Sequence, residues 1–245
     1  PDTQRFFSRI VFRPGGGNPL DHKAFEKGFG DLAVRFKMDW SLANGEARPK
    51  TVIAVSKFGH CLNDLLHRFK NGALPIDVRA IISNHDNMRD MADWYGIPYH
   101  HIPVSKQTKL ESEAAFYKTI EEYSADLIVL ARYMQILSDG LAAKLSGRCI
   151  NIHHSFLPSF KGAKPYHQAH ARGVKLIGAT AHYVTSDLDE GPIIEQDVER
   201  VDHSMTAEQL VEIGSNIEAR VLSRAVKWHA EKRVIRNKDK TIVFK

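Results

Sequence analysis

The chain has 245 residues and a formal net charge of +5, and 43% of its residues are hydrophobic and 26% charged. These values are typical of one large globular domain, or of a domain and a fragment, and they exclude disordered and collagen-like chains. No apolar run approaches the ~18 residues of a membrane-spanning helix, and the basic residues form no coherent stripe, so we expect neither a membrane nor a nucleic acid as partner.

The first 45 residues differ from the rest and are predicted to form a small β-α-β piece. Residues 6–12 are rich in aromatic and β-branched side chains, which is typical of a strand. Residues 21–35 carry apolar side chains at spacings of three and four, which mark one face of a helix. Residues 38–42 are predicted to form a second strand, and a polar linker follows.

From residue 51 onward, strands alternate with helices. Strands are predicted at residues 51–56, 76–83, 99–104, 126–131, 149–153, 176–184 and 193–201. Helices are predicted at residues 61–69, 88–95, 112–123 and 206–232, the last with a capping box at Thr206 and Gln209, and a terminal hairpin at 233–244. This alternation predicts an α/β fold with an open, mostly parallel, Rossmann-like sheet and helices on both faces. Such sheets bind ligands at the carboxyl ends of their strands, where the strand order reverses.

The segment after the strand at 149–153 carries the densest set of reactive side chains. Asn151 and His153 are two residues apart in a strand, so they point to the same face. An amide and an imidazole side by side can both donate hydrogen bonds to one oxygen, as a developing oxyanion requires. The alternative is structural, with Asn151 capping the strand end and the histidines satisfied within the core.

A second polar segment, residues 182–194 (HYVTSDLDEGPII), follows the next strand. Asp187 and Asp189 lie in this short loop before Gly191. One of these carboxylates could serve as a general acid or base. Aspartates also form tight turns through side-chain hydrogen bonds to the backbone, and the residues alone leave both roles open.

Other chemistries find less support in the sequence. The chain has neither the metal-binding patterns H-E-x-x-H and C-x-x-C nor the G-x-S-x-G nucleophile elbow, and the adjacent histidines at 100–101 and 153–154 would point to opposite faces of a strand. We therefore expect no metal site. The turn at residues 56–63 (SKFGHCLN) lacks the glycines of a dinucleotide or nucleotide loop, although the N-terminus of the helix that follows could attract an anion.

Three segments together resemble the folate-dependent formyl-transfer family: residues 151–166 (NIHHSFLPSFKGAKPY), 178–194 (GATAHYVTSDLDEGPII) and 130–138 (LARYMQILS), the last similar to its folate-binding segment. The resemblance covers residues 51–232. Details such as SKFGHCLNDLL and HHSFLPSF are most similar to the deformylase branch, which hydrolyses formyltetrahydrofolate. Residues 1–45 resemble the second half of an ACT domain, a small regulatory module, and residues 46–245 the catalytic domain.

The resemblance implies hydrolysis of 10-formyltetrahydrofolate to formate and tetrahydrofolate, with folate as the substrate and no cofactor. It assigns Asn151 and His153 as oxyanion stabilisers and Asp189 as the acid/base group. The positions that it implies for substrate binding are Met134, Gln135, Ile136, Leu137, His182 and Thr185.

Two alternatives remain open beside hydrolysis. One is a formyltransferase to an amine acceptor such as glycinamide ribonucleotide, and the other is a non-catalytic folate- or amino-acid-binding regulator. We expect a homo-oligomer, because half an ACT-like module leaves apolar side chains exposed, and an amino-acid effector at that module. We also expect a cytoplasmic location, since two cysteines cannot form a disulfide framework.

Overall fold

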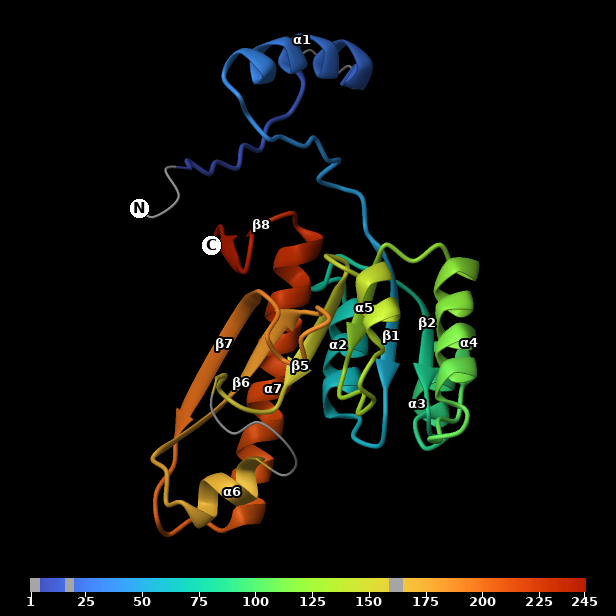
Figure 1. Cartoon of the computed structure of the whole chain (residues 1–245), viewed down its shortest axis with the longest axis vertical. Coiled ribbons are helices and arrows are strands. Elements are labelled where there is room, and N and C mark those ends of the chain that lie inside the picture. Colours follow the sequence, from blue (N-terminus) through green and yellow to red (C-terminus); the bar gives the residue numbers. More distant parts are fainter. Residues whose placement is uncertain (1–4, 16–19, 159–164) are drawn as a thin grey trace. The chain divides into compact units, whose positions relative to one another are not determined.

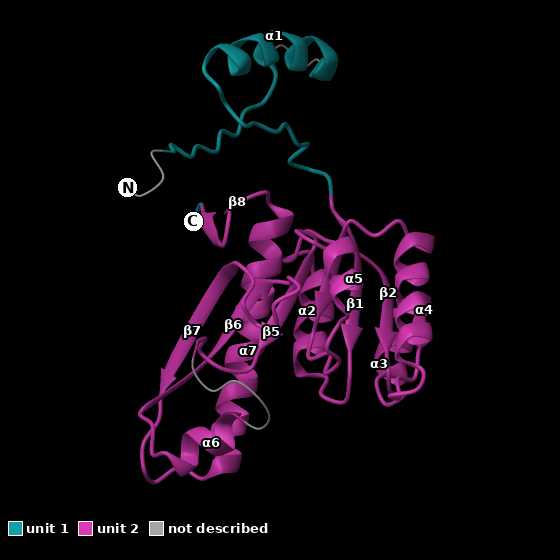
Figure 2. Cartoon of the chain, viewed as in Figure 1, with its two compact units in different colours: residues 1–47, 244 teal, residues 48–243, 245 magenta. Residues whose placement is uncertain are grey.

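The computed structural model describes residues 5–15, 20–158 and 165–245. The chain divides into two compact units, residues 1–47 with residue 244 and residues 48–243 with residue 245 (Figure 2). The second unit carries the α/β fold, and the site described below lies within it.

The first unit contains one helix, α1 (His22–Arg35), and its described residues include no strand. The strands predicted at residues 6–12 and 38–42 are therefore wrong. Strand propensity is realised only where a neighbouring strand completes the backbone hydrogen bonds, and neither segment has such a neighbour among the described residues. The aromatic side chains pack against one another instead, with ring centroids 5.7 Å apart for Phe25 and Phe29 and 4.8 Å apart for Phe29 and Trp40.

The second unit is built on a seven-stranded sheet, which confirms the predicted fold class (Figure 1). Its strands are β1 (Lys50–Val55), β2 (Asp77–Ser83), β3 (Tyr99–His101), β4 (Leu127–Leu130), β5 (Cys149–His153), β6 (Leu176–Tyr183) and β7 (Ile193–Arg200). They lie in the order β3-β2-β1-β4-β5-β6-β7. Strands β1 to β5 are parallel to one another, β6 pairs antiparallel with β5, and β7 pairs antiparallel with β6. The strand order therefore reverses between β1 and β4.

The described residues of the unit also form six helices and a terminal hairpin: α2 (His60–Lys70), α3 (Arg89–Tyr95), α4 (Lys109–Glu122), α5 (Asp139–Lys144), α6 (Pro165–Ala171), α7 (Ala207–Ala230), β8 (Val234–Asn237) and β9 (Lys240–Val243). The capping box of α7 is confirmed. Helices α5 and α6 were not predicted, because six or seven residues are too few for a helical period to show. None of the described helices combines the length and apolar character needed to cross a membrane.

Side-chain alternation along the strands sorts the core into two layers on opposite faces of the sheet. Ile150 and Ile152 of β5 pack in the layer that includes the apolar faces of α2 and α7. Cys149 packs in the layer that includes residues of α4 and α5. Because side chains alternate, Asn151 and His153 share the face of Cys149.

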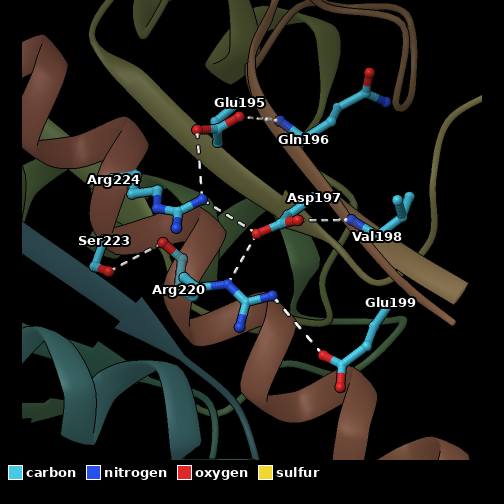
Figure 3. A network of polar contacts seen from close by, with 8 residues as sticks. All are labelled: Glu195, Gln196, Asp197, Val198, Glu199, Arg220, Ser223 and Arg224. Carbon is cyan, nitrogen blue, oxygen red and sulfur yellow. Dashed lines mark hydrogen bonds and ion pairs between the residues drawn. The ribbon is translucent and has the colours of Figure 1, made fainter. Parts of the chain in front are cut away.

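Charged side chains join α7 to the edge strand β7 (Figure 3). Asp197 Oδ2 accepts hydrogen bonds from Arg220 Nε at 2.8 Å and from Arg224 Nη1 at 3.1 Å, and Glu195 and Glu199 lie 4.0 and 3.9 Å from these arginines. Both arginine side chains are more than one third exposed. Exposed pairs of this kind contribute little stability, so α7 is held mainly by its buried apolar face.

A tight turn between β6 and β7 brings the chain back across the sheet. Asp189 adopts a left-handed conformation, with φ of 58°. Tyr183 N donates a hydrogen bond to Pro192 O at 3.0 Å, which closes the turn. A Cβ atom at Gly191 would lie only 1.7 Å from the carbonyl oxygen of Tyr183. This position therefore requires glycine.

We predict that Gly191→Ala destabilises the protein by about 1–3 kcal/mol, the usual cost of overpacking, and displaces the loop that carries Asp189. Thermal unfolding of the two proteins measures the effect. Gly140→Ala is the matched control, since a Cβ atom there meets no atom within 4 Å. Equal melting temperatures for Gly191→Ala and the unsubstituted protein would contradict the close approach.

Candidate active site

The antiparallel pairing of β5 with β6 gathers the polar side chains on one face of the sheet. In this register Asn151 lies opposite His182, and His153 lies opposite Thr180. Because β6 runs antiparallel to β5, the loop after β6 starts beside the first residue of β5, where Val184 N donates a hydrogen bond to Cys149 O at 2.9 Å. The loop then turns back and places Asp189 over the same face.

The three residues predicted to be catalytic meet at this point. His153 Nδ1 lies 3.1 Å from Asp189 Oδ2, and His182 Nε2 lies 3.7 Å from the other carboxylate oxygen, Oδ1. Asn151 Nδ2 lies 3.3 Å from His182 Nε2. The two imidazoles are buried, with only 5% and 2% of their residue surface exposed. The site therefore combines one amide, two imidazoles and one carboxylate.

The contact between His153 and Asp189 determines the charge of the carboxylate. Burial raises the pKa of the Asp189 carboxyl, but the hydrogen bond from His153 and the nearby imidazole of His182 outweigh it and hold the pKa well below the usual range. The carboxylate is therefore ionised at neutral pH, and His153 Nδ1 donates its proton to it. His153 Nε2 is buried and has no hydrogen-bond partner within the described part of the chain, so it is the atom that can meet a ligand.

His182 positions Asn151. Its Nδ1 lies 3.0 Å from the carbonyl oxygen of Tyr183, to which it donates a hydrogen bond. In the neutral ring Nε2 is then an acceptor and takes a hydrogen bond from the Asn151 amide. One N–H of that amide is used in this way, and the other stays available on the site face. Direct contact of His182 with substrate stays a prediction.

The predicted folate segment follows β4, the strand next to β5. Ser56, at the end of β1, holds this segment: its N–H donates to Arg132 O at 3.1 Å, and its hydroxyl oxygen accepts from Met134 N–H at 2.9 Å. The main-chain N–H of Met134 is therefore already occupied. A shallow hollow lies beside the segment, lined on this side by Tyr133, Gln135, Ile136 and Leu137.

Thr185 lies in the β6–β7 loop, and the structure gives it a turn-forming contact. Its hydroxyl donates to the carbonyl oxygen of Asp187 at 3.1 Å. The Asp187 residue itself is exposed. Of the two aspartates between which the sequence left the choice open, Asp189 is the one that faces the histidines. Residues 159–164, which belong to the same motif as His153, lie outside the described residues.

A second polar cluster, which the sequence did not predict, lies on the other face of the sheet. Glu218 of α7 is 1% exposed. Its carboxylate lies 2.8 Å from His60 Nε2 and 3.3 Å from Arg132 Nε, and it accepts a hydrogen bond from the Tyr166 hydroxyl at 2.8 Å. The sequence feature that could have indicated this cluster is Glu218 itself, an acidic residue directly after Ile217 in the apolar face of α7.

His60, Cys61 and Glu218 also offer three potential metal-ligand atoms within 4.8 Å of one another. Both carboxylate oxygens of Glu218 already have protein partners, however, and one partner is the cation Arg132. Burial and the Glu218 charge raise the pKa of the Cys61 thiol, which disfavours the thiolate that a metal needs. We therefore describe the cluster as an ionic network.

Comparison with known proteins identifies the family of the chain. Residues 49–226 match the formyl transferase family model. The formyltetrahydrofolate deformylase of Corynebacterium sp. is 53% identical over 98% of this chain and 84% of its own, and that of Bacillus subtilis is 48% identical over 100% and 81%.

Solved structures show the same relationship. A formyltetrahydrofolate deformylase from Burkholderia mallei is 54% identical with a TM-score of 0.87, covering 92% of this chain and 80% of its own. A glycinamide ribonucleotide transformylase from Symbiobacterium toebii is 27% identical with a TM-score of 0.77, covering 85% of this chain and 99% of its own. The chain belongs to the formyl transferase family, and its high-identity relatives place it with the formyltetrahydrofolate deformylases.

Proposed function

We propose that this protein hydrolyses 10-formyltetrahydrofolate to formate and tetrahydrofolate. The observation that carries the proposal is the buried His153, with Nδ1 on an ionised carboxylate, Nε2 without a partner among the described residues, and the Asn151 amide on the same face. Relatives that are 42–53% identical and cover most of the chain are formyltetrahydrofolate deformylases.

The chemistry follows from the substrate bond and these side chains. The N10-formyl group is an amide, so water must add to its carbonyl carbon and generate a tetrahedral oxyanion. The Asn151 amide N–H and the Nε2–H of His153, which has taken up a proton from solvent, donate to that oxygen, while Nδ1–H of the imidazolium stays on the Asp189 carboxylate. The attacking water gives one proton to Asp189, directly or through a second water, and this proton passes to N10 as the C–N bond breaks. Tetrahydrofolate and formic acid form, and the acid releases its remaining proton to solvent as formate leaves.

Folate recognition is proposed for the segment after β4. The edge of a pteridine ring carries donors and acceptors that main-chain groups can match. Ser56 already binds the Met134 N–H, so the main chain of Gln135, Ile136 and Leu137 is the favoured partner. The adjacent hollow is lined by the same residues. Thr185 stays a predicted substrate contact.

We also propose self-association through the first unit. Its exposed apolar side chains are Phe6, Ile10, Val11, Val34 and Phe36, and burial against a second copy would remove them from water. An ACT-like identity for this unit and an amino-acid effector stay predictions. Both cysteines are free and buried, which supports the proposed cytoplasmic location.

The proposed function predicts formate release from 10-formyltetrahydrofolate without any amine, metal or nicotinamide cofactor. Water is the second substrate, so adding an amine should leave the rate unchanged. Formate production and the loss of formyltetrahydrofolate measure the reaction. Turnover that appears only with an amine acceptor would identify the protein as a transferase, and tight folate binding without turnover would identify it as a regulator.

Asn151→Ala and His153→Ala should each lower kcat by ~10²–10³, the usual effect of removing one oxyanion donor, with little change in KM. The donors act on charge that develops only in the transition state. Steady-state kinetics separate the two constants. An increase in KM at unchanged kcat would assign these residues to substrate binding instead.

Asp189→Asn should fold normally and lose most activity, because a neutral amide neither accepts the proton nor stabilises the imidazolium. Asp187→Asn is the matched control: it lies two residues away in the same loop, is exposed, and should keep near-normal turnover. Circular dichroism monitors folding, and formate release monitors turnover. Similar activities for the two variants would remove Asp189 from the mechanism.

A further inference from the structure

We propose that the C-terminal end of α7 and the hairpin β8–β9 position the proposed reaction site, and that they do so through the side chain of Tyr183. Tyr183 is then a positioning residue, which acts through its main chain rather than on the substrate, and His229 is its anchor. The proposal rests on the hydrolytic function above and adds to that site two residues that the mechanism does not use.

Two parts of the reaction site are attached to the main chain of Tyr183. Its N–H donates a hydrogen bond to Pro192 O at 3.0 Å, which closes the loop that carries Asp189. Its carbonyl oxygen accepts a hydrogen bond from His182 Nδ1 at 3.0 Å. Nε2 of that ring is therefore the acceptor for the Asn151 amide. A displacement at Tyr183 would disturb both an oxyanion donor and the catalytic carboxylate.

The side chain of Tyr183 is held from the opposite face of the sheet. Tyr183 follows His182 in β6, so its side chain points away from the site and packs in the core layer that includes α7. The residue is 2% exposed. Its hydroxyl lies 2.7 Å from His229 Nδ1, near the C-terminal end of α7, and the two rings meet edge to face with centroids 5.7 Å apart.

The protonation of the two groups defines the direction of this hydrogen bond. Burial, together with the positive charges of Lys232 and Arg236, lowers the pKa of His229 to about 4. Burial raises the pKa of the Tyr183 hydroxyl well above its usual value. Both groups are therefore neutral at physiological pH, and the phenol O–H donates to the lone pair of Nδ1. Loss of the hydroxyl would leave a buried nitrogen unpaired, which costs free energy.

The terminal hairpin contacts both ends of the loop between β6 and β7. Arg236 of β8 and Thr241 of β9 are paired in register, so their side chains share one face of the hairpin. The guanidinium of Arg236 lies over the ring of Tyr183, 5.9 Å from its centroid. The hydroxyl of Thr241 donates to Ile193 O at 2.5 Å. Tyr183 ends β6 and Ile193 begins β7, so one cross-strand pair holds the loop that carries Asp189 at both ends.

A structural role for the same contacts makes a different prediction. A buried phenol requires a hydrogen-bond partner in any case. Loss of a bond that only stabilises the fold would lower the melting temperature and leave kcat of the folded protein unchanged. Loss of a positioning bond lowers kcat at constant KM, because a misplaced oxyanion donor weakens the transition state and not the bound substrate.

The test is Tyr183→Phe, which removes the hydroxyl and keeps the ring. We expect kcat for formate release to fall about tenfold at unchanged KM. His229→Leu removes the acceptor and should lower kcat to a similar extent, whereas His229→Asn offers an amide oxygen near the place of Nδ1 and should keep near-normal kcat. Tyr123→Phe is the matched control. Its hydroxyl also meets a histidine, His100 Nε2 at 3.0 Å, so this variant should lose stability without losing kcat.

A second measurement needs no substrate. The ¹⁵N chemical shifts of the His182 ring report which nitrogen carries the proton. We expect the Nδ1–H tautomer in the unsubstituted protein and in Tyr123→Phe, and a mixture of both tautomers in Tyr183→Phe. An unchanged His182 tautomer in folded Tyr183→Phe would overturn the proposal, and so would an unchanged kcat in this variant.

Two further points keep the outcome decisive. If Tyr183→Phe does not fold, the same two measurements apply to Thr241→Val, which removes the donor to Ile193 at a partly exposed position. Formate release by the unsubstituted protein tests the hydrolytic function separately. Because the tautomer of His182 is measured without turnover, failure of the hydrolytic function remains distinguishable from failure of this inference.

Discussion

The antiparallel pairing of β6 with β5 is the constraint on which the proposed site depends. It sets Asn151 opposite His182 and sends the next loop back over the face that carries His153. Gly191 lets that loop approach the Tyr183 carbonyl, so Asp189 reaches the imidazole at 3.1 Å. A parallel β6 would start its following loop at the other end of β5. The two antiparallel strands at the edge of a parallel sheet thus create the site.

Adjacent side chains at the end of β5 lie in two different environments. His153 faces the carboxylate of Asp189, whereas His154 lies near Tyr166 and the ionic network of Glu218. The first environment holds an ionised aspartate beside an imidazole whose Nε2 has no partner in the described part of the chain, which suits attack on an amide. The second is an internal network of ion pairs and hydrogen bonds around Glu218. The alternation of two adjacent residues therefore separates the two environments.

The two groups of charged side chains differ in burial and therefore in the energetic cost of losing a partner. The arginines that join α7 to β7 are partly exposed, so their ion pairs are screened and contribute little stability. Glu218 is buried with three partners, and removal of one partner would leave an uncompensated charge in a poorly solvated place. Such a group costs desolvation energy to maintain.

The sequence by itself determined the strand and helix alternation from residue 51 onward, the convergence of Asn151, His153 and Asp189 through the family resemblance, and the capping of α7. These features depend on local periodicity and on motifs. The strands expected at residues 6–12 and 38–42 failed because strand formation needs a partner that no local pattern reveals. Only the tertiary structure decided that Ser56 occupies the Met134 N–H and that Glu218 reaches α2, because these contacts join segments more than 75 residues apart.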